Sequence, residues 1–220
     1  CSSWGFRIAL VVVAGAELFT GNNLIVMAWA SRRISTAKLL RNWGIVYAGN
    51  FVGSVATAAL VVVAGQYTSG GGVVGANVLA IADAKCQLGF TQAFALGVLC
   101  NALVCLAIWL CFSARSTTDK VLCIIFPITA FVAAGFEHSI ANMYFIPAAL
   151  FVQSSAGPDF WSAIGTAPGA YEALSWAAFA KHLVPVTLGN IVGGSLMVGA
   201  VYWFVYGRSP VEANSGDNGA

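Results

Sequence analysis

Five long apolar stretches limit what this chain can fold into. They lie at roughly residues 3–30, 39–64, 89–113, 120–152 and 176–206. Each is longer than the about 20 residues that an α-helix needs to cross a bilayer. Hydrophobic residues occupy 59% of the 220 positions and charged residues only 8%, well below the charged fraction of an ordinary soluble domain. The sequence therefore predicts an all-α membrane protein that crosses the bilayer several times.

The composition also excludes several classes of protein. The net charge is +2, and the ten Lys and Arg residues are spread along the chain without a basic patch, so nucleic-acid binding is not expected. No Cys-x-x-Cys pair occurs, and four cysteines lie in or beside apolar stretches: Cys100, Cys105, Cys111 and Cys123. We interpret them as small core residues rather than as disulfides or metal ligands. No cofactor, no metal and no enzymatic activity are expected.

The positions of the basic residues predict an orientation, because the cytoplasmic loops of membrane proteins retain Lys and Arg. Seven basic residues flank the first turn, the third turn or the end of the last stretch: Arg32, Arg33, Lys38, Arg41, Arg115, Lys120 and Arg208. The opposite side has three: Arg7, Lys85 and Lys181. The two turns and the C-terminus are therefore expected in the cytoplasm, with the chain in the cytoplasmic membrane.

The remaining segments are interpreted as loops and a tail. Two long connections, 65–88 and 153–175, are expected to be loops on the outer side, with Lys85 in the first of them. We expect residues 1–208 to form one transmembrane domain and residues 209–220, which are small and polar, to form a disordered cytoplasmic tail.

An internal repeat runs through the chain. Residues 15–22 resemble residues 135–142, and Gly-Asn-Phe-Val-Gly at 49–53 resembles Gly-Asn-Ile-Val-Gly at 189–193. Because three helix reversals separate the copies, they cross the membrane in opposite directions, as in many transporters whose substrate site lies near the bilayer midplane. A helix precedes the second copy, so an equivalent helix is expected before the first. This predicts an inverted repeat of six spans, of which five are present here.

Polar residues lie at mid-depth in both copies. Glu17 and Glu137 each follow about 15 residues of span, where a charge is costly and usually functional. Small and polar residues follow each of them, so both helices are expected to be broken there. We interpret the two glutamates and Asn50 as supports of the broken helices, although Asn50 and Asn190 also fit a close-packing role between glycines. His138 adjoins the second break and is a candidate for proton chemistry or for a purely structural hydrogen bond.

Four motifs carry a family resemblance. They are Ala-Glu-Leu-Phe-Thr at 16–20, Gly-Asn-Phe-Val-Gly at 49–53, Gly-Phe-Glu-His-Ser-Ile-Ala-Asn-Met at 135–143 and Pro-Val-Thr-Leu-Gly-Asn-Ile-Val-Gly-Gly at 185–194. Together they resemble the formate/nitrite transporter family, and the formate branch more than the nitrite or hydrosulfide branches. The resemblance implies an aquaporin-like fold of six spans, assembled as a homopentamer with one anion path in each protomer.

The resemblance also implies roles for particular residues. The substrate path and proton relay would contain His138, Thr20, Lys85, Asn142 and Asn190. The constriction of the path would be formed by Leu18, Phe19, Val104 and Phe131. Residues that the missing first span contributes are not assigned.

The expected function is transport of formate, as the anion or as the acid together with a proton. A neutral acid is the less costly passenger through an apolar centre, and histidine changes charge near neutral pH, so His138 is expected to relay the proton while the Thr20 hydroxyl holds its ring. The expected partners are formate or a related small anion, protons, further copies of the chain and membrane lipid. Nitrite or hydrosulfide remains the near alternative. A haem-bearing membrane anchor fits poorly, because His138 is central whereas His182 is expected near the outer end of its helix.

Overall fold

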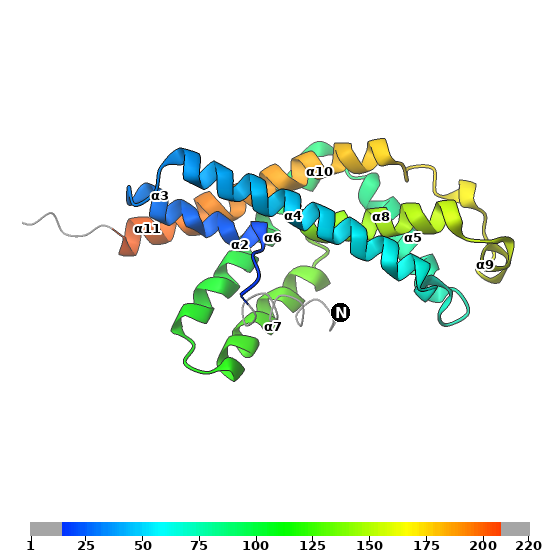
Figure 1. Cartoon of the computed structure of the whole chain (residues 1–220), viewed down its shortest axis with the longest axis horizontal. Coiled ribbons are helices and arrows are strands. Elements are labelled where there is room, and N and C mark those ends of the chain that lie inside the picture. The colour runs from blue at the N-terminus through cyan, green and yellow to red at the C-terminus, as the bar shows by residue number, and fades with distance from the viewer. Residues whose placement is uncertain (1–14, 208–220) are drawn as a thin grey trace, which may run out of the picture.

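The computed structural model describes residues 15–207, and the regular structure in that range is entirely helical (Figure 1). The elements in chain order are α2 (Phe19–Asn22), η1 (Asn23–Ile25), α3 (Val26–Ala30), α4 (Thr36–Val63), η2 (Gln66–Thr68), α5 (Val73–Cys86), α6 (Phe90–Ser113), α7 (Thr117–Ala133), α8 (Ser139–Ser155), α9 (Pro158–Ala163), η3 (Pro168–Ala170), α10 (Trp176–Ile191), the π-helix η4 (Val192–Ala200) and α11 (Val201–Tyr206).

Within residues 15–207, three helices are long and apolar enough to cross a membrane. They are Thr36–Val63, Phe90–Ser113 and Trp176–Tyr206, the last formed by α10, η4 and α11 without interruption. In the most apolar segment of Thr36–Val63, only 11% of the residues are buried inside the protomer. That helix therefore presents its apolar side chains outwards. Lipid or other subunits, rather than water, suit such a surface. The prediction of an all-α membrane fold is confirmed for the described range.

Of the two remaining apolar stretches, the one at 120–152 is interrupted, as expected, and the described part of the first begins with a non-helical segment. The stretch predicted at 120–152 is divided into α7, which ends at Ala133, and α8, which begins at Ser139. In the first stretch, residues 15–18 are non-helical and α2 begins at Phe19. Gly15 and Gly135 have φ angles of 75° and 68°, a left-handed conformation that costs glycine little. In both copies of the repeat, the non-helical segment therefore follows a glycine in the left-handed conformation.

One expectation about the outer connections is wrong. Residues 65–88 are not an irregular loop, because α5 occupies Val73–Cys86. This helix has 14 residues, which is too short to cross a bilayer, so a search for spanning stretches passes over it. Its consequence is that Lys85 lies in the last turn of a packed helix rather than in a solvated loop.

Close packing of α6 against α10 and η4 positions the second break. A methyl group on Gly97 would lie 2.8 Å from the carbonyl oxygen of Val186, and methyl groups on Gly189 and Gly193 would collide with the α6 backbone. Small residues at such crossings let two membrane helices approach closely. The approach brings Asn190 of α10 next to the chain between α7 and α8.

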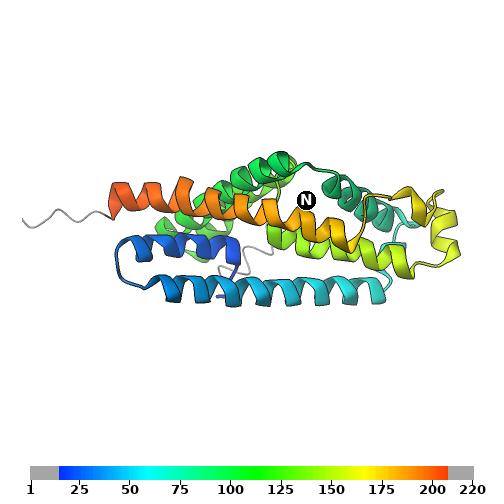
Figure 2. The same ribbon diagram turned by 90° about the horizontal axis from the view of Figure 1, so that it is seen from above.

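Most of the helices lie roughly along one long axis. Figures 1 and 2 place α3 and α11 at one end of that axis, and α9 with the connection after α4 at the other. In Figure 1, α6 and α7 project to one side of the bundle. The basic turn after α3 and the end of α11 therefore lie at the same end.

Candidate functional site

An asparagine braces each broken helix. Asn190 is fully buried; its Oδ1 accepts from the Ser139 backbone N–H at 2.8 Å, and its Nδ2 donates to the Glu137 carbonyl at 3.0 Å and to the Gly97 carbonyl at 2.8 Å. The Ser139 and Glu137 groups flank the break and lack regular helical partners, whereas the Gly97 carbonyl lies within α6. Asn190 thereby replaces the hydrogen bonds that the interruption removes.

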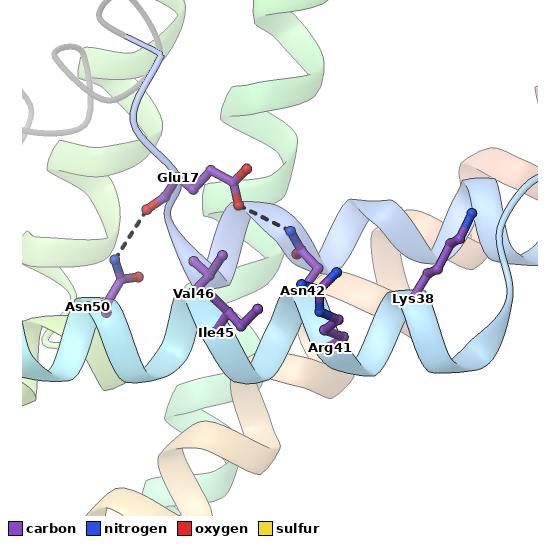
Figure 3. A pocket seen from close by; sticks show the side chains of 8 residues that line it. Glu17, Lys38, Arg41, Asn42, Ile45, Val46 and Asn50 are labelled. Carbon is purple, nitrogen blue, oxygen red and sulfur yellow. Dashed lines mark hydrogen bonds between the residues drawn. The ribbon is translucent and has the colours of Figure 1, made fainter.

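The first break has the same brace. Asn50 Oδ1 accepts from the Phe19 backbone N–H at 3.0 Å, and its Nδ2 donates to the Glu17 carbonyl at 3.2 Å (Figure 3). The inverted repeat thus extends from the sequence to individual hydrogen bonds. Asn190 was predicted in the substrate path, but its amide in this structure has the same bracing contacts as that of Asn50.

The two glutamates also occupy equivalent positions but differ in their surroundings. Glu17 Oε2 accepts from Asn22 Nδ2 at 2.8 Å and from Asn42 Nδ2 at 3.1 Å. Its exposed carboxylate borders an open pocket of about 550 Å³ that also contains Lys38 and Arg41 (Figure 3). Within residues 15–207, Glu17 makes no ion pair of 4.0 Å or less.

Glu137 is buried and ion-paired. Its Oε1 lies 2.7 Å from Lys85 Nζ, while Oε2 accepts from Asn142 Nδ2 at 2.6 Å and lies 3.2 Å from His182 Nε2. A buried carboxylate needs such partners, because an isolated one would be very costly. Lys85, expected as a loop residue, therefore extends inward from α5 to the second break.

His138 is the N-cap residue of α8, and its ring faces Thr20. Its Nδ1 accepts from the Ala141 backbone N–H at 3.1 Å, so the neutral ring carries its proton on Nε2 and donates to Thr20 Oγ1 at 3.0 Å. The ring stacks on Phe131 with 5.9 Å between centroids. A second proton, on Nδ1, would point at the Ala141 N–H, so the helix cap and a charged ring exclude each other in this geometry.

A cavity of about 470 Å³ extends between Lys85 and His138. Its polar lining residues are Lys85, His138 and Asn142, and the rest of the wall is apolar and includes Phe131 and Phe136. The buried Asn142 Oδ1 has no hydrogen-bond partner among the described residues. Apolar walls with a few convergent polar groups are typical of sites for small ligands.

The four predicted constriction residues lie in two clusters. Val104 and Phe131 are buried in one cluster, whereas Phe19 is buried in the other, with Tyr47 at 4.9 Å between ring centroids. Leu18 packs against both clusters. Of the four, only Phe131 lines the cavity that contains Lys85.

Asn101 and His182 belong to the polar network but were not among the predicted site residues. Asn101 of α6 is fully buried and donates its Nδ2 to the carbonyls of Thr20 and Asn190, at 3.2 and 2.6 Å. Its position in the middle of an apolar span was a signal that could have identified it. His182 lies near the start of α10, yet it is 4% exposed and contacts Glu137.

Two interrupted helices, related by an inverted repeat and joined by a buried polar network, define a class of membrane transport proteins. The family model for formate/nitrite transporters matches residues 2–204. The chain therefore belongs to the formate/nitrite transporter family, which confirms the resemblance seen in the sequence.

Relatives and a solved structure agree with this assignment. The chain is 46% identical to the formate channel FocA of Escherichia coli (strain K12), over 94% of this chain and 73% of the relative. It is 44% identical to FocA of Haemophilus influenzae, over 87% of this chain and 68% of the relative. A solved structure titled a pentameric formate channel with formate bound has a TM-score of 0.85 and 42% identity, and the match covers 93% of this chain and 80% of that one. The predicted fold class, an aquaporin-like inverted repeat, agrees with that structural similarity.

Proposed function

We propose that this protein is a homopentameric formate channel of the cytoplasmic membrane, with one path through each protomer. The observation that carries the proposal is the cavity lined by Lys85, His138 and Asn142, which brings a cation and the polar break into one largely apolar space. The relatives named formate channels and the solved pentamer support the substrate and the assembly. The outward-facing apolar side chains of α4 support burial between subunits or in lipid.

We propose that the basic turn after α3 and the end of α11 face the cytoplasm. Arg32 and Arg33 are exposed at that turn, and cytoplasmic turns retain basic residues. The cavity with Lys85 then opens towards the outer side. Protease protection of sealed vesicles, with a cleavage site inserted after Arg33, would test the orientation.

We propose that formate crosses the apolar centre with a proton. Moving a charge to mid-bilayer costs several kcal/mol or more, whereas protonating an acid of pKa about 4 at pH 7 costs about 4 kcal/mol. The neutral His138 ring donates through Nε2 to Thr20 and accepts at Nδ1 from Ala141, so its Nε2–H can donate to the carboxyl group of the substrate once Thr20 is released. To relay a proton itself, the ring must first release the Ala141 N–H.

The decisive experiment compares wild-type and His138→Asn protein in proteoliposomes. Asparagine is a good helix cap, so the variant keeps an acceptor for the Ala141 N–H while losing the imidazole. We expect proton-coupled formate uptake to be abolished and the pentamer to persist in native mass spectrometry. If His138→Asn protein moves formate with protons at the wild-type rate and pH profile, His138 is only a structural hydrogen-bonding residue.

The same preparation separates the alternative functions. Fluxes of formate, nitrite, lactate, hydrosulfide and glycerol rank the substrates, and a preference for nitrite or hydrosulfide would reassign the branch. A haem-bearing anchor is disfavoured, because His138 contacts Thr20 and Ala141 while His182 contacts Glu137. A Soret band in the purified protein would contradict that conclusion.

A further inference from the structure

The two halves of the protein differ at one hydrogen-bonding position beside the glutamates. The same step of 140 residues that relates Asn50 to Asn190 relates Asn42 to His182. Asn42 Nδ2 donates to Glu17 Oε2 at 3.1 Å, and His182 Nε2 lies 3.2 Å from Glu137 Oε2. An amide in the first half is therefore replaced by a titratable imidazole in the second.

The neighbours of His182 determine which of its two ring nitrogens donates a hydrogen bond to the Glu137 carboxylate. Asn142 uses its Nδ2 to donate to Glu137 Oε2 at 2.6 Å, and the same Nδ2 lies 3.1 Å from His182 Nε2. Only a proton on Nε2 makes the His182 contact with Glu137 a hydrogen bond, because a carboxylate oxygen accepts but does not donate. Nδ1 is buried without a partner among residues 15–207, so it is the atom left to gain a proton.

The charge of the cluster depends on that proton. Lys85 and Glu137 form an ion pair at 2.7 Å and cancel each other. Other charged or titratable groups on the surrounding elements include Asp83 and Cys86 on α5, Cys100 on α6, Tyr47 on α4, Tyr144 on α8 and the exposed Lys181 on α10 itself. A proton on His182 adds one positive charge to a cluster whose carboxylate is already neutralised.

We propose that His182 is a pH-sensing residue that regulates anion entry, an inference that rests on the proposed transport function. Protonated His182 competes with Lys85 for Glu137, and this competition leaves Lys85 freer to attract an anion at the mouth of the cavity. Histidine changes charge between pH 5 and 8, and a positive cleft raises the local concentration of an anion by tenfold or more. Anion entry is therefore favoured as the pH falls.

The test is a His182→Asn variant, which copies the residue of the first half. Asparagine keeps a donor for Glu137, as Asn42 does for Glu17, but carries no charge at any pH. Initial rates of formate uptake are measured between pH 5.5 and 8, where formate, with pKa about 4, remains almost wholly ionised. We expect the wild-type KM to fall by about tenfold from pH 8 to pH 5.5, and the variant to keep the wild-type KM of pH 8 at every pH.

This design distinguishes a failure of the proposed transport function from a failure of the role proposed for His182. Wild-type protein that carries no formate would overturn the proposed function, whereas wild-type transport with an unchanged pH profile in His182→Asn would overturn only the role of His182. A direct measurement does not depend on transport or on the folding of that variant. Residues 1–220 contain two histidines, so in ¹⁵N-histidine-labelled His138→Asn protein without a histidine tag the imidazole signal from these residues belongs to His182. A ring that stays neutral down to pH 5 refutes the proposal.

Discussion

Replacement of Asn190 by alanine tests whether the broken helix depends on a side-chain brace. The change removes hydrogen bonds to the Ser139 N–H and to the Glu137 and Gly97 carbonyls at a fully buried position. The Ser139 N–H lies at the start of α8, where the helix offers it no acceptor. The Glu137 carbonyl lies in the break, so it too is left without a regular partner.

The expected loss follows from these partners. A buried polar group left unpaired costs about 1–3 kcal/mol, and a hydrogen bond between membrane helices contributes about 0.6 kcal/mol on average. Two orphaned groups at the lower limit plus one interhelical bond at the average give a destabilisation of about 3 kcal/mol. Asn50→Ala removes two bonds at a partly exposed site, where water can replace them, so about 1 kcal/mol is expected.

The assay is unfolding in mixed micelles by increasing SDS, followed by tryptophan fluorescence. Asn50→Ala is the matched control, because it removes the same type of brace from the other half. Equal stability of the two variants, or wild-type stability of Asn190→Ala, would refute the bracing role. The earlier prediction that Asn190 lines the substrate path would then be the better interpretation.

Three further changes test other parts of the site. Lys85→Ala should lower formate uptake at limiting concentration and destabilise the fold, because Glu137 loses its counter-ion; Lys181→Ala, at an exposed position, should do neither. Thr20→Val removes the acceptor of His138 and should slow uptake by about tenfold, for a loss of about 1.4 kcal/mol, whereas Thr20→Ser should preserve the rate. Gly193→Ala should destabilise the protein by about 1–3 kcal/mol in the same SDS assay, since its methyl group would meet the α6 backbone; an unchanged midpoint would contradict the packing described for α10.

Several differences between the two halves of the repeat lie at the site. Residues 15–22 and 135–142 align so that Leu18 corresponds to His138, while Glu17 and Glu137 are retained. The bracing asparagines are common to both halves, whereas the imidazoles and the ion pair with Lys85 belong to the second. Both halves thus share the bracing hydrogen bonds at the helix breaks, whereas only the second half has the histidines and the ion pair with Lys85.

The sequence by itself determined the membrane class, the inverted repeat and the location of both breaks. Length and hydropathy are sufficient to identify spans such as Thr36–Val63, because the bilayer imposes a fixed thickness. A charged residue inside an apolar stretch, as at Glu137, marks a site for the same reason. Both signals are local, so they can be read along the chain without knowing which segments meet.

Only the tertiary structure decided which polar groups act on one another. Lys85 was expected in a loop, but the structure shows that it forms an ion pair with Glu137. His182 lies beside the same carboxylate, and Asn190 donates a hydrogen bond to the backbone at the helix break. These contacts join residues separated by 45 to 53 positions. Hydrogen bonds and ion pairs act over a few ångströms, so the crossing of helices, which glycines such as Gly97 permit at close range, determines which of them form.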